Sequence, residues 1–278
     1  MKIAICGLGL IGGSFARAYK AEGHTVLGRD INESTMSFAI QNGICDGTYG
    51  DADIASCDLL IIALCPQTAI AYLESIAPLV GEKCTVIDIC GTKRDVCEAG
   101  YRLAKEHGFR FCGTHPMAGL HFSGIHYSRA DLFKDASMVL VPREGESEDF
   151  INEVKALLAP AHFGRFTLCD PYEHDKMIAY TSQLAHVVSN AYVKSPTARM
   201  HHGFSAGSYK DLTRVAKLDE NMWTELFLQN ADCLGAELDG IISSLTEYKK
   251  AIEEKDANTL RSLLREGRII KEETDGNV

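Results

Sequence analysis

The chain has 278 residues, of which 46% are hydrophobic, and this length and composition suit a soluble protein of two domains. Its formal net charge of −10 argues against a nucleic-acid or membrane partner, and no apolar run approaches the roughly 20 residues of a membrane helix. The ten cysteines form no CxxC pair and no signal peptide precedes the first strand pattern, so we expect reduced cysteines, a cytoplasmic location and no bound metal.

A glycine-rich loop follows the first apolar run of the sequence, residues 3–6. The loop comprises Gly7, Leu8, Gly9, Leu10, Ile11 and Gly12. A helical pattern begins near Ser14, and a second apolar run, residues 25–28, leads into Arg29 and Asp30. This succession of strand, glycine loop, helix, strand and acidic residue is typical of a dinucleotide-binding site.

Each part of this motif has its own physical reason. Gly7 permits a tight turn, Gly9 lets a pyrophosphate approach the backbone, and Gly12 allows helix and strand to pack closely. We expect Asp30 to accept hydrogen bonds from the adenosine ribose, which favours NAD over NADP because the carboxylate would repel a 2′-phosphate. Arg29 leaves partial accommodation of that phosphate open, and a nucleotide-free domain with incidental glycines is the structural alternative.

The sequence up to residue 170 alternates strands with helices. The predicted strands are residues 58–65, 85–90, 109–114, 137–141 and 163–168, and the predicted helices include residues 67–80 and 93–106. Continuous apolar runs such as residues 58–65 are typical of parallel strands that are buried on both faces. We therefore predict an α/β fold in which residues 1–170 form a doubly wound Rossmann domain, with its ligand crevice at the carboxyl ends of the strands.

The pattern after residue 170 is wholly helical. Asp170, Pro171 and Glu173 form a helix start, with Asp at the N-cap, Pro at the first position and Glu at the third. This helix should run to about Val193. We expect residues 171–278 to form an all-helical substrate and dimerisation domain.

A long helix is predicted from about Asn221 onward. Its apolar residues step by three and four and are Phe227, Ala231, Leu234, Leu238, Ile241, Leu245, Tyr248 and Ile252. Some 30 residues of helix would span about 45 Å, more than a small domain can easily cover. This length favours a symmetric homodimer, and the alternative is a helical bundle formed within a single chain. Residues from Lys271 onward look like a frayed tail.

Two histidine-containing segments are candidates for chemistry. His115 ends a predicted strand, just before Pro116, so it should point into the crevice where a nicotinamide would sit. Imidazole has the right pKa range to accept a proton as hydride leaves a carbinol, although a loop histidine can also be purely structural. The helix after residue 170 carries His174, Gln183 and His186, and the last two, three residues apart, share a face that is either functional or simply solvated.

Two cations form a third candidate element. Lys210 and Arg214 are four residues apart, so on a helix they would form a clamp suited to a carboxylate. Trp223 is the only tryptophan and follows nine residues later, where core packing is the simplest explanation for it.

Three well-separated motifs resemble those of the prephenate/arogenate dehydrogenase family of tyrosine biosynthesis. They are residues 7–14, residues 115–119 with the Ser-Gly pair at 123–124, and residues 210–216 with the Met-Trp pair at 222–223. The resemblance implies an N-terminal Rossmann domain, a helical dimerisation domain and NAD(P)-dependent oxidative decarboxylation of a small cyclohexadienol to a phenol. For prephenate, the product would be 4-hydroxyphenylpyruvate.

The resemblance also implies roles for individual residues. His115 matches the family's catalytic histidine, which hydrogen-bonds the ring hydroxyl, and Arg214 matches its substrate-carboxylate arginine. His186 matches a histidine that faces the substrate. Trp223 matches a residue that can reach the site of the partner subunit.

Several positions depart from the family pattern. Gln183 stands where a histidine is usual, and His121 replaces a usual glutamate. Gly91 occupies the place of a serine that helps to hold the ring hydroxyl, so we expect the neighbouring Thr92 to stand in for it. These changes leave the reaction class intact and leave open whether prephenate or arogenate is preferred.

Two other functions are compatible with a Rossmann and helical layout. A β-hydroxyacid dehydrogenase would carry a catalytic lysine in a glycine-spaced motif on the interdomain helix, whereas Lys176 and Lys194 lie at the helix ends outside such a motif. A non-catalytic NAD-sensing dimer would need neither His115 nor Arg214.

Overall fold

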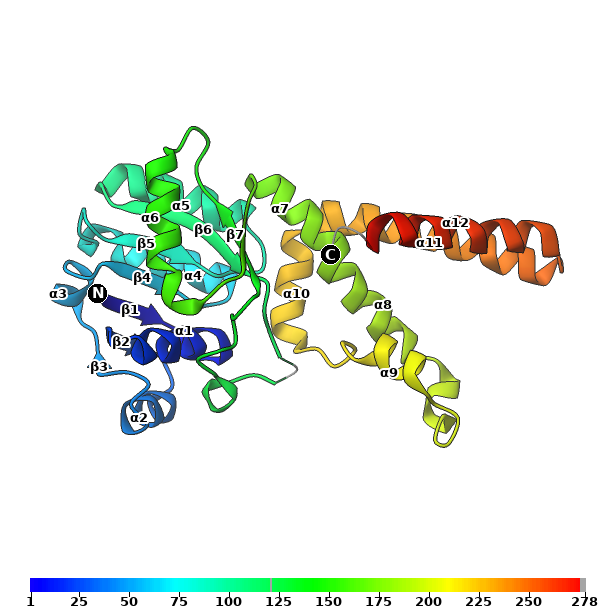
Figure 1. Ribbon diagram of the computed structural model, residues 1–278, viewed down its shortest axis with the longest axis horizontal. Coiled ribbons are helices and arrows are strands. Elements are labelled where there is room, and N and C mark those ends of the chain that lie inside the picture. The colour runs from blue at the N-terminus through cyan, green and yellow to red at the C-terminus, as the bar shows by residue number, and fades with distance from the viewer. Residues whose placement is uncertain (121, 276–278) are drawn as a thin grey trace. The chain divides into compact units, whose positions relative to one another are not determined.

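The computed structural model describes residues 1–120 and 122–275, which form two compact units (Figure 1). The first unit is Met1–Asn230 and the second begins at Ala231. The first unit is larger than the predicted Rossmann domain of residues 1–170, because it also includes the helical segments that follow residue 170.

An eight-stranded sheet forms the centre of the first unit. Its strands are β1 (Lys2–Cys6), β2 (Thr25–Arg29), β3 (Gly47–Thr48), β4 (Leu59–Ile62), β5 (Thr85–Asp88), β6 (Arg110–Pro116), β7 (Ser137–Val141) and β8 (Arg165–Leu168). The strand order is β3-β2-β1-β4-β5-β6-β7-β8. Every neighbouring pair from β3 to β6 is parallel, which confirms the doubly wound Rossmann sheet.

The last two strands run the other way. β7 pairs antiparallel with β6 and parallel with β8. Two neighbouring parallel strands need a crossover connection of a dozen or more residues, which usually contains a helix. Among the described residues that connect β6 to β7, the only helical segment is the short turn η2 (Ile125–Tyr127). The sheet is therefore mixed at this edge, which the apolar runs alone did not reveal.

Helices cover both faces of the sheet. They are α1 (Leu10–Ala21), α2 (Glu33–Gln41), α3 (Asp51–Ile54), α4 (Pro66–Ile76), α5 (Arg94–His107) and α6 (Glu148–Leu157), with short turns η1 (Ala77–Leu79) and η3 (Ala159–Ala161). Along β1, Ile3 and Ile5 join the core on the α1 and α6 side, whereas Ala4 and Cys6 join the core on the α4 and α5 side. Because both faces of the sheet are buried, the central strands consist of continuous apolar runs in the sequence.

The remaining helices of the first unit follow β8. They are α7 (Pro171–Ile178), a π-helical segment η4 (Ala179–Leu184), α8 (Ala185–Tyr192), η5 (Pro196–Met200), α9 (Gly207–Thr213) and α10 (Glu220–Gln229). The predicted helix start is confirmed, since Pro171 is the first helical residue and the Asp170 carboxylate accepts the Glu173 N–H at 2.8 Å.

The predicted continuous helix beyond Asn221 is wrong. The chain leaves helical geometry at Asn230, which separates α10 from α11 (Ala231–Glu253). Asn230 is fully buried, and its Nδ2 donates to the Asp175 carbonyl and to Gln183 Oε1, each at 2.8 Å. Its Oδ1 accepts from Arg94 at 2.9 Å. The apolar spacing continues through this position, so the pattern could not show that a polar side chain interrupts the helix.

The second unit is a helical hairpin of α11 and α12 (Ala257–Asp275). Lys255 turns the chain with φ +56°, and the Asp256 carboxylate caps α12 by accepting the N–H groups of Asn258 and Thr259. The expected frayed tail is therefore wrong for Lys271–Asp275, which are helical and joined by an ion pair; residues 276–278 lie outside the described part. Among the described helices, none is both long and apolar enough to cross a membrane.

Replacing Asn230 tests the origin of the helix break. Asn230→Ala should lower the free energy of unfolding by about 2–4 kcal/mol, because it leaves several buried polar partners unsatisfied. Urea unfolding monitored by circular dichroism gives the value, and Asn221→Ala, at an exposed position of α10, is the matched control. Equal stability of the two variants would contradict this explanation.

Candidate active site

The glycine loop has the geometry of a dinucleotide cradle. A Cβ on Gly12 would lie 1.9 Å from the Gly7 carbonyl oxygen, so only glycine allows this approach of helix and turn. A Cβ on Gly9 would meet nothing within 4 Å, which leaves that backbone open to a ligand. α1 begins directly after Gly9 with no side-chain cap, so its first N–H groups are available to phosphates.

Asp30 is held in place at the end of β2. Its Oδ2 accepts the Leu8 N–H at 2.8 Å and its Oδ1 accepts the Asn32 N–H at 2.9 Å. The carboxylate therefore joins the glycine loop to the end of β2, and its remaining lone pairs can accept ribose hydroxyls. Together with the open backbone at Gly9, this arrangement fits an NAD molecule.

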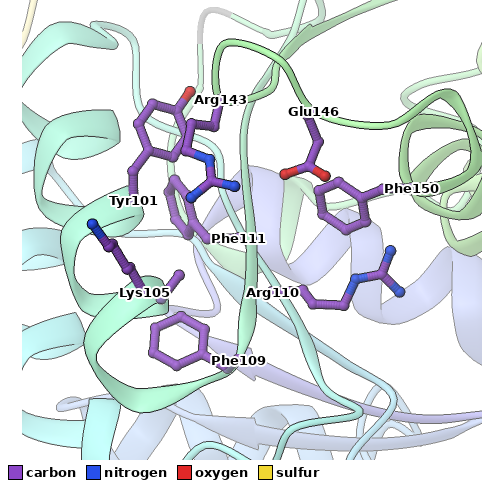
Figure 2. Close-up of a pocket in the computed structure, with 9 residues that line it drawn as sticks. Tyr101, Lys105, Phe109, Arg110, Phe111, Arg143, Glu146 and Phe150 are labelled. Carbon is purple, nitrogen blue, oxygen red and sulfur yellow. The ribbon is translucent and has the colours of Figure 1, made fainter.

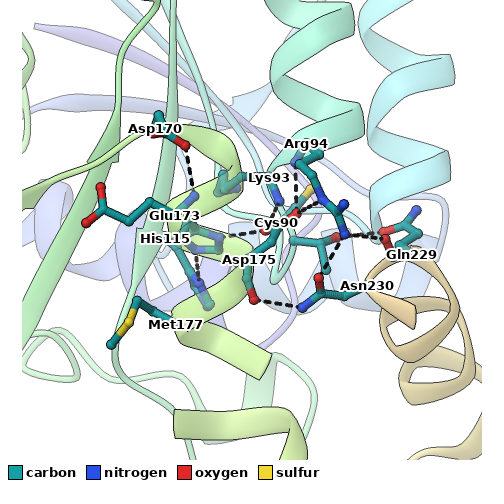
Figure 3. A network of polar contacts seen from close by, with 12 residues as sticks. Cys90, Lys93, Arg94, His115, Asp170, Glu173, Asp175, Met177, Gln229 and Asn230 are labelled. Atoms are coloured by element: carbon teal, nitrogen blue, oxygen red, sulfur yellow. Dashed lines mark hydrogen bonds and ion pairs between the residues drawn. The ribbon is translucent and has the colours of Figure 1, made fainter. Parts of the chain in front are cut away.

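His115 belongs to a chain of buried polar contacts (Figure 3). It is the penultimate residue of β6, and its Nδ1 lies 2.9 Å from Nε2 of His174. His174 Nδ1 in turn lies 2.8 Å from Oδ1 of Asp175. An ionised carboxylate only accepts, so the Nδ1 proton of His174 points at Asp175 and its Nε2 accepts from His115 Nδ1–H. This pattern leaves the lone pair of His115 on Nε2.

Asp175 is fixed by the loop before α5. It is 1% exposed, its Oδ1 also accepts the Lys93 N–H at 2.7 Å, and its Oδ2 accepts the Arg94 backbone N–H and Nε, each at 3.1 Å. Burial alone would raise the pKa of Asp175, but the hydrogen bond from His174 and those from the backbone N–H groups of Lys93 and Arg94 bring it below its ordinary value. Asp175 therefore remains an anion that orients His174.

The surroundings keep His115 uncharged. Burial holds the pKa of His115 well below its ordinary value, and the positive charge of Lys93 lowers it further. Lys93 is completely buried and forms an ion pair with Asp88, whose carboxylate raises the Lys93 pKa above its usual range against the opposing effect of burial. A neutral imidazole with a free lone pair can act as a general base at neutral pH.

A second cluster gathers around His186. Its Nδ1 lies 2.8 Å from the Ser182 carbonyl, and its ring packs against Trp223 with centroids 4.0 Å apart and an interplanar angle of 30°. Burial lowers the pKa of His186 despite the Ser182 hydrogen bond, and the charge of Arg214 lowers it further. Lys210 lies within α9 and Arg214 follows that helix directly; both are exposed, and neither has an ion-pair partner within residues 1–120 and 122–275.

Two expected substrate contacts have other partners in the structure. Gln183 is 1% exposed, its Nε2 donates to the Leu226 carbonyl at 3.1 Å, and its Oε1 accepts from Asn230. The expectation that it shares a face with His186 assumed a regular α-helix, whereas the π-helical segment ends between them and buries Gln183. Gln183 thus ties this helix to α10, and its contact with a substrate stays a prediction.

Thr92 is held by the same helix. Its hydroxyl donates to Oε1 of Gln229 at 2.6 Å, so its proton is not directed at a substrate. At the neighbouring Gly91, a Cβ would lie 3.2 Å from a methyl carbon of Leu226, which occupies the space beside it. His121, the other departure from the family pattern, lies outside the described residues.

The link between His115 and His174 is the feature that sequence reasoning missed. His174 was among the candidates, but it lies 59 residues from His115, and only the fold brings the two rings together. The sequence shows Asp88 and Lys93 at the end of an apolar run, but it does not show that they form a buried ion pair.

A cavity of about 200 Å³ lies elsewhere, at the start of β6 (Figure 2). Lys105, Phe109 and Arg110 are among its lining residues, and the Arg110 guanidinium stacks 4.2 Å from the centre of the Phe150 ring. Arg110 is five residues from His115 along the strand, or roughly 17 Å. This cavity is therefore separate from the candidate active site.

Comparisons with known proteins agree with this geometry. The family model "Prephenate dehydrogenase, nucleotide-binding domain" matches residues 15–164, and "Prephenate dehydrogenase, dimerization domain" matches residues 170–266. The chain belongs to the prephenate dehydrogenase family. It is therefore an NAD-dependent dehydrogenase with a nucleotide-binding domain and a helical domain.

Individual relatives match along nearly the whole chain. Prephenate dehydrogenase of Lactococcus lactis is 30% identical over 98% of this chain and 77% of that protein, and the Bacillus subtilis enzyme is 28% identical over 93% and 72%. The structure of prephenate dehydrogenase from Aquifex aeolicus in complex with hydroxyphenyl propionate and NAD+ superposes with a TM-score of 0.84, at 29% identity, and covers 98% of each chain.

The lowered pKa of His115 predicts the pH dependence of catalysis. A protonated His115 cannot accept a proton, so kcat/KM should fall only as the pH drops through this lowered pKa. We therefore expect kcat/KM to stay constant from about pH 8 down to about pH 6. Initial rates in buffers of constant ionic strength measure it, and an acidic limb centred at or above the ordinary imidazole value of 6.5 would contradict the assignment.

Proposed function

We propose that the protein oxidatively decarboxylates prephenate to 4-hydroxyphenylpyruvate with reduction of NAD+. The observation that carries the proposal is the chain of contacts from His115 through His174 to Asp175, at the carboxyl end of the parallel strands, where the glycine loop also lies. The relatives named prephenate dehydrogenase support the substrate, and the Aquifex aeolicus complex supports an aromatic carboxylate beside NAD+.

His115 has a simple task in this reaction. NAD+, when bound, accepts the hydride from the ring carbon that bears the hydroxyl. His115 Nε2 takes the hydroxyl proton as that carbon becomes a carbonyl, and its Nδ1–H remains bonded to His174. Loss of the ring carboxylate as CO2 then gives a phenolate, to which His115 can return the proton. Because the ring becomes aromatic, positioning of the substrate is the main task left to the chain.

The two exposed cations suit the carboxylate that stays on the substrate. Prephenate carries one carboxylate on the ring, which must leave, and one on the side chain. A strong ion pair to the leaving carboxylate would stabilise the substrate against decarboxylation. We therefore assign Arg214, with Lys210, to the side-chain carboxylate, and His186 and Trp223 to the wall beside it.

We also propose a homodimer. The matched model is a dimerisation domain, and the second unit exposes large apolar side chains along both of its helices, among them Ile242, Leu245, Ile252 and Leu264. The reach of Trp223 into a partner subunit stays a prediction; within one chain its ring is stacked on His186.

Product analysis tests the function together with its base. With prephenate and NAD+, the protein should form NADH, CO2 and 4-hydroxyphenylpyruvate in equal amounts, and His115→Asn should lower kcat roughly 10²–10⁴-fold. NAD+ affinity, measured by calorimetry, should be unchanged in the variant. Near-normal turnover by His115→Asn would overturn the assignment of the base. A kcat/KM that is higher with arogenate than with prephenate would show that arogenate is the substrate.

The carboxylate clamp predicts a different kinetic signature. Arg214→Ala should raise KM much more than it lowers kcat, because an ion pair made equally in ground and transition states is uniform binding. Arg214→Lys should recover only part of the affinity, since lysine lacks the planar fork. Steady-state kinetics in prephenate distinguish these effects, with the exposed Lys217→Ala as control. An Arg214→Ala variant that loses kcat alone would contradict the clamp.

A further inference from the structure

Arg29 and Asp30 are adjacent at the end of β2, and their charges favour opposite cofactors. A carboxylate accepts hydrogen bonds from the 2′-hydroxyl of NAD, whereas an arginine can bind the 2′-phosphate of NADP. The direction in which each side chain points therefore decides which of the two governs cofactor choice.

Strand geometry sends the two side chains to opposite faces of the sheet. A Cβ on Gly28 would lie 2.7 Å from Leu8, and Asp30, two residues later, bonds the Leu8 N–H. These residues therefore face the glycine loop. Arg29 is in register with Cys6 of β1, whose side chain belongs to the core on the α4 and α5 side.

A tyrosine is positioned to hold Arg29 on that second face. Thr48 pairs with Gly28, so Tyr49 is next in line beside Arg29. The Arg29 guanidinium carbon lies 6.0 Å from the centre of the Tyr49 ring. Tyr49 is 3% exposed, and its hydroxyl lies 2.6 Å from that of Tyr72 on α4, so the ring is a fixed surface.

The charge environment agrees with this placement. Burial raises the pKa of Cys6; the charge of Arg29 opposes this effect, and the charge of Asp30 adds to it. Burial also raises the pKa of Tyr72, and the charge of Arg29 opposes this effect. No ion pair joins Arg29 to Asp30 in the part of the chain that the structure describes.

We propose that Tyr49 is a specificity-determining residue that selects NAD by holding the Arg29 guanidinium on the α4 side of the sheet. The 2′-position of the adenosine then meets the Asp30 carboxylate without a compensating cation. The exposed Arg29 side chain is thus biased away from the 2′-phosphate of NADP, although it directly precedes the acidic residue in the sequence.

Binding of cofactor fragments to the full-length protein tests this proposal without relying on turnover. Calorimetry compares 2′,5′-ADP, which carries the 2′-phosphate, with 5′-ADP, which lacks it. Tyr49→Leu keeps an apolar side chain but removes the aromatic face, and it should improve the affinity for 2′,5′-ADP relative to 5′-ADP roughly 2–5-fold, the scale of a modest cation–π contact. The ratio of kcat/KM for NADP+ to that for NAD+ should move in the same direction.

Three control variants make the result decisive. Tyr49→Phe keeps the ring and should leave the ratio unchanged, and adding Arg29→Gln to Tyr49→Leu should abolish the gain. Arg29→Gln alone should not weaken 2′,5′-ADP, and this measurement stands even if Tyr49→Leu does not fold. A folded Tyr49→Leu with an unchanged ratio, a gain that survives Arg29→Gln, or selective loss of 2′,5′-ADP affinity in Arg29→Gln alone would each overturn the proposal.

Discussion

The contact between Asp175 and the loop before α5 is the constraint on which the candidate site depends. Two consecutive backbone N–H groups, from Lys93 and Arg94, bind the two oxygens of this buried carboxylate. Asp175 then fixes the tautomer of His174, and His174 fixes that of the proposed base, His115. Without the carboxylate, neither ring would have a defined proton position, and the lone pair of His115 would not be directed at a substrate.

The same loop connects this chain of contacts to the sheet. Asp88 ends β5, pairs with the buried Lys93, and accepts the Cys90 N–H at 2.9 Å and the Thr114 N–H at 3.3 Å. Thr114 directly precedes His115, so one buried ion pair holds both the strand that carries the base and the loop that binds Asp175. Burial lowers the pKa of both histidines, and the charge of Lys93 lowers it further, so the group that holds the core together also favours the neutral form of the proposed base.

The sequence predicts those parts of the fold and of the site that depend on residues close together along the chain. The Rossmann domain, the Asp170 helix cap and the positions of His115 and Arg214 follow from short patterns, since a glycine loop, a cap or a strand end is encoded within a few residues. The break at Asn230, the π-helical segment that buries Gln183, and the pairing of His115 with His174 depend on partners far away in the sequence. Periodicity carries no information about those partners, so the continuous helix was predicted incorrectly and the buried partners of Gln183 were not foreseen.

The state of the His115 ring is the most direct test of the account. Nitrogen-15 NMR of the imidazole side chains distinguishes the two neutral tautomers and the imidazolium, and His115→Asn assigns the signal. At about pH 7 we expect a neutral ring with its proton on Nδ1, as the contact with His174 requires. A proton on Nε2, or an imidazolium at that pH, would contradict it.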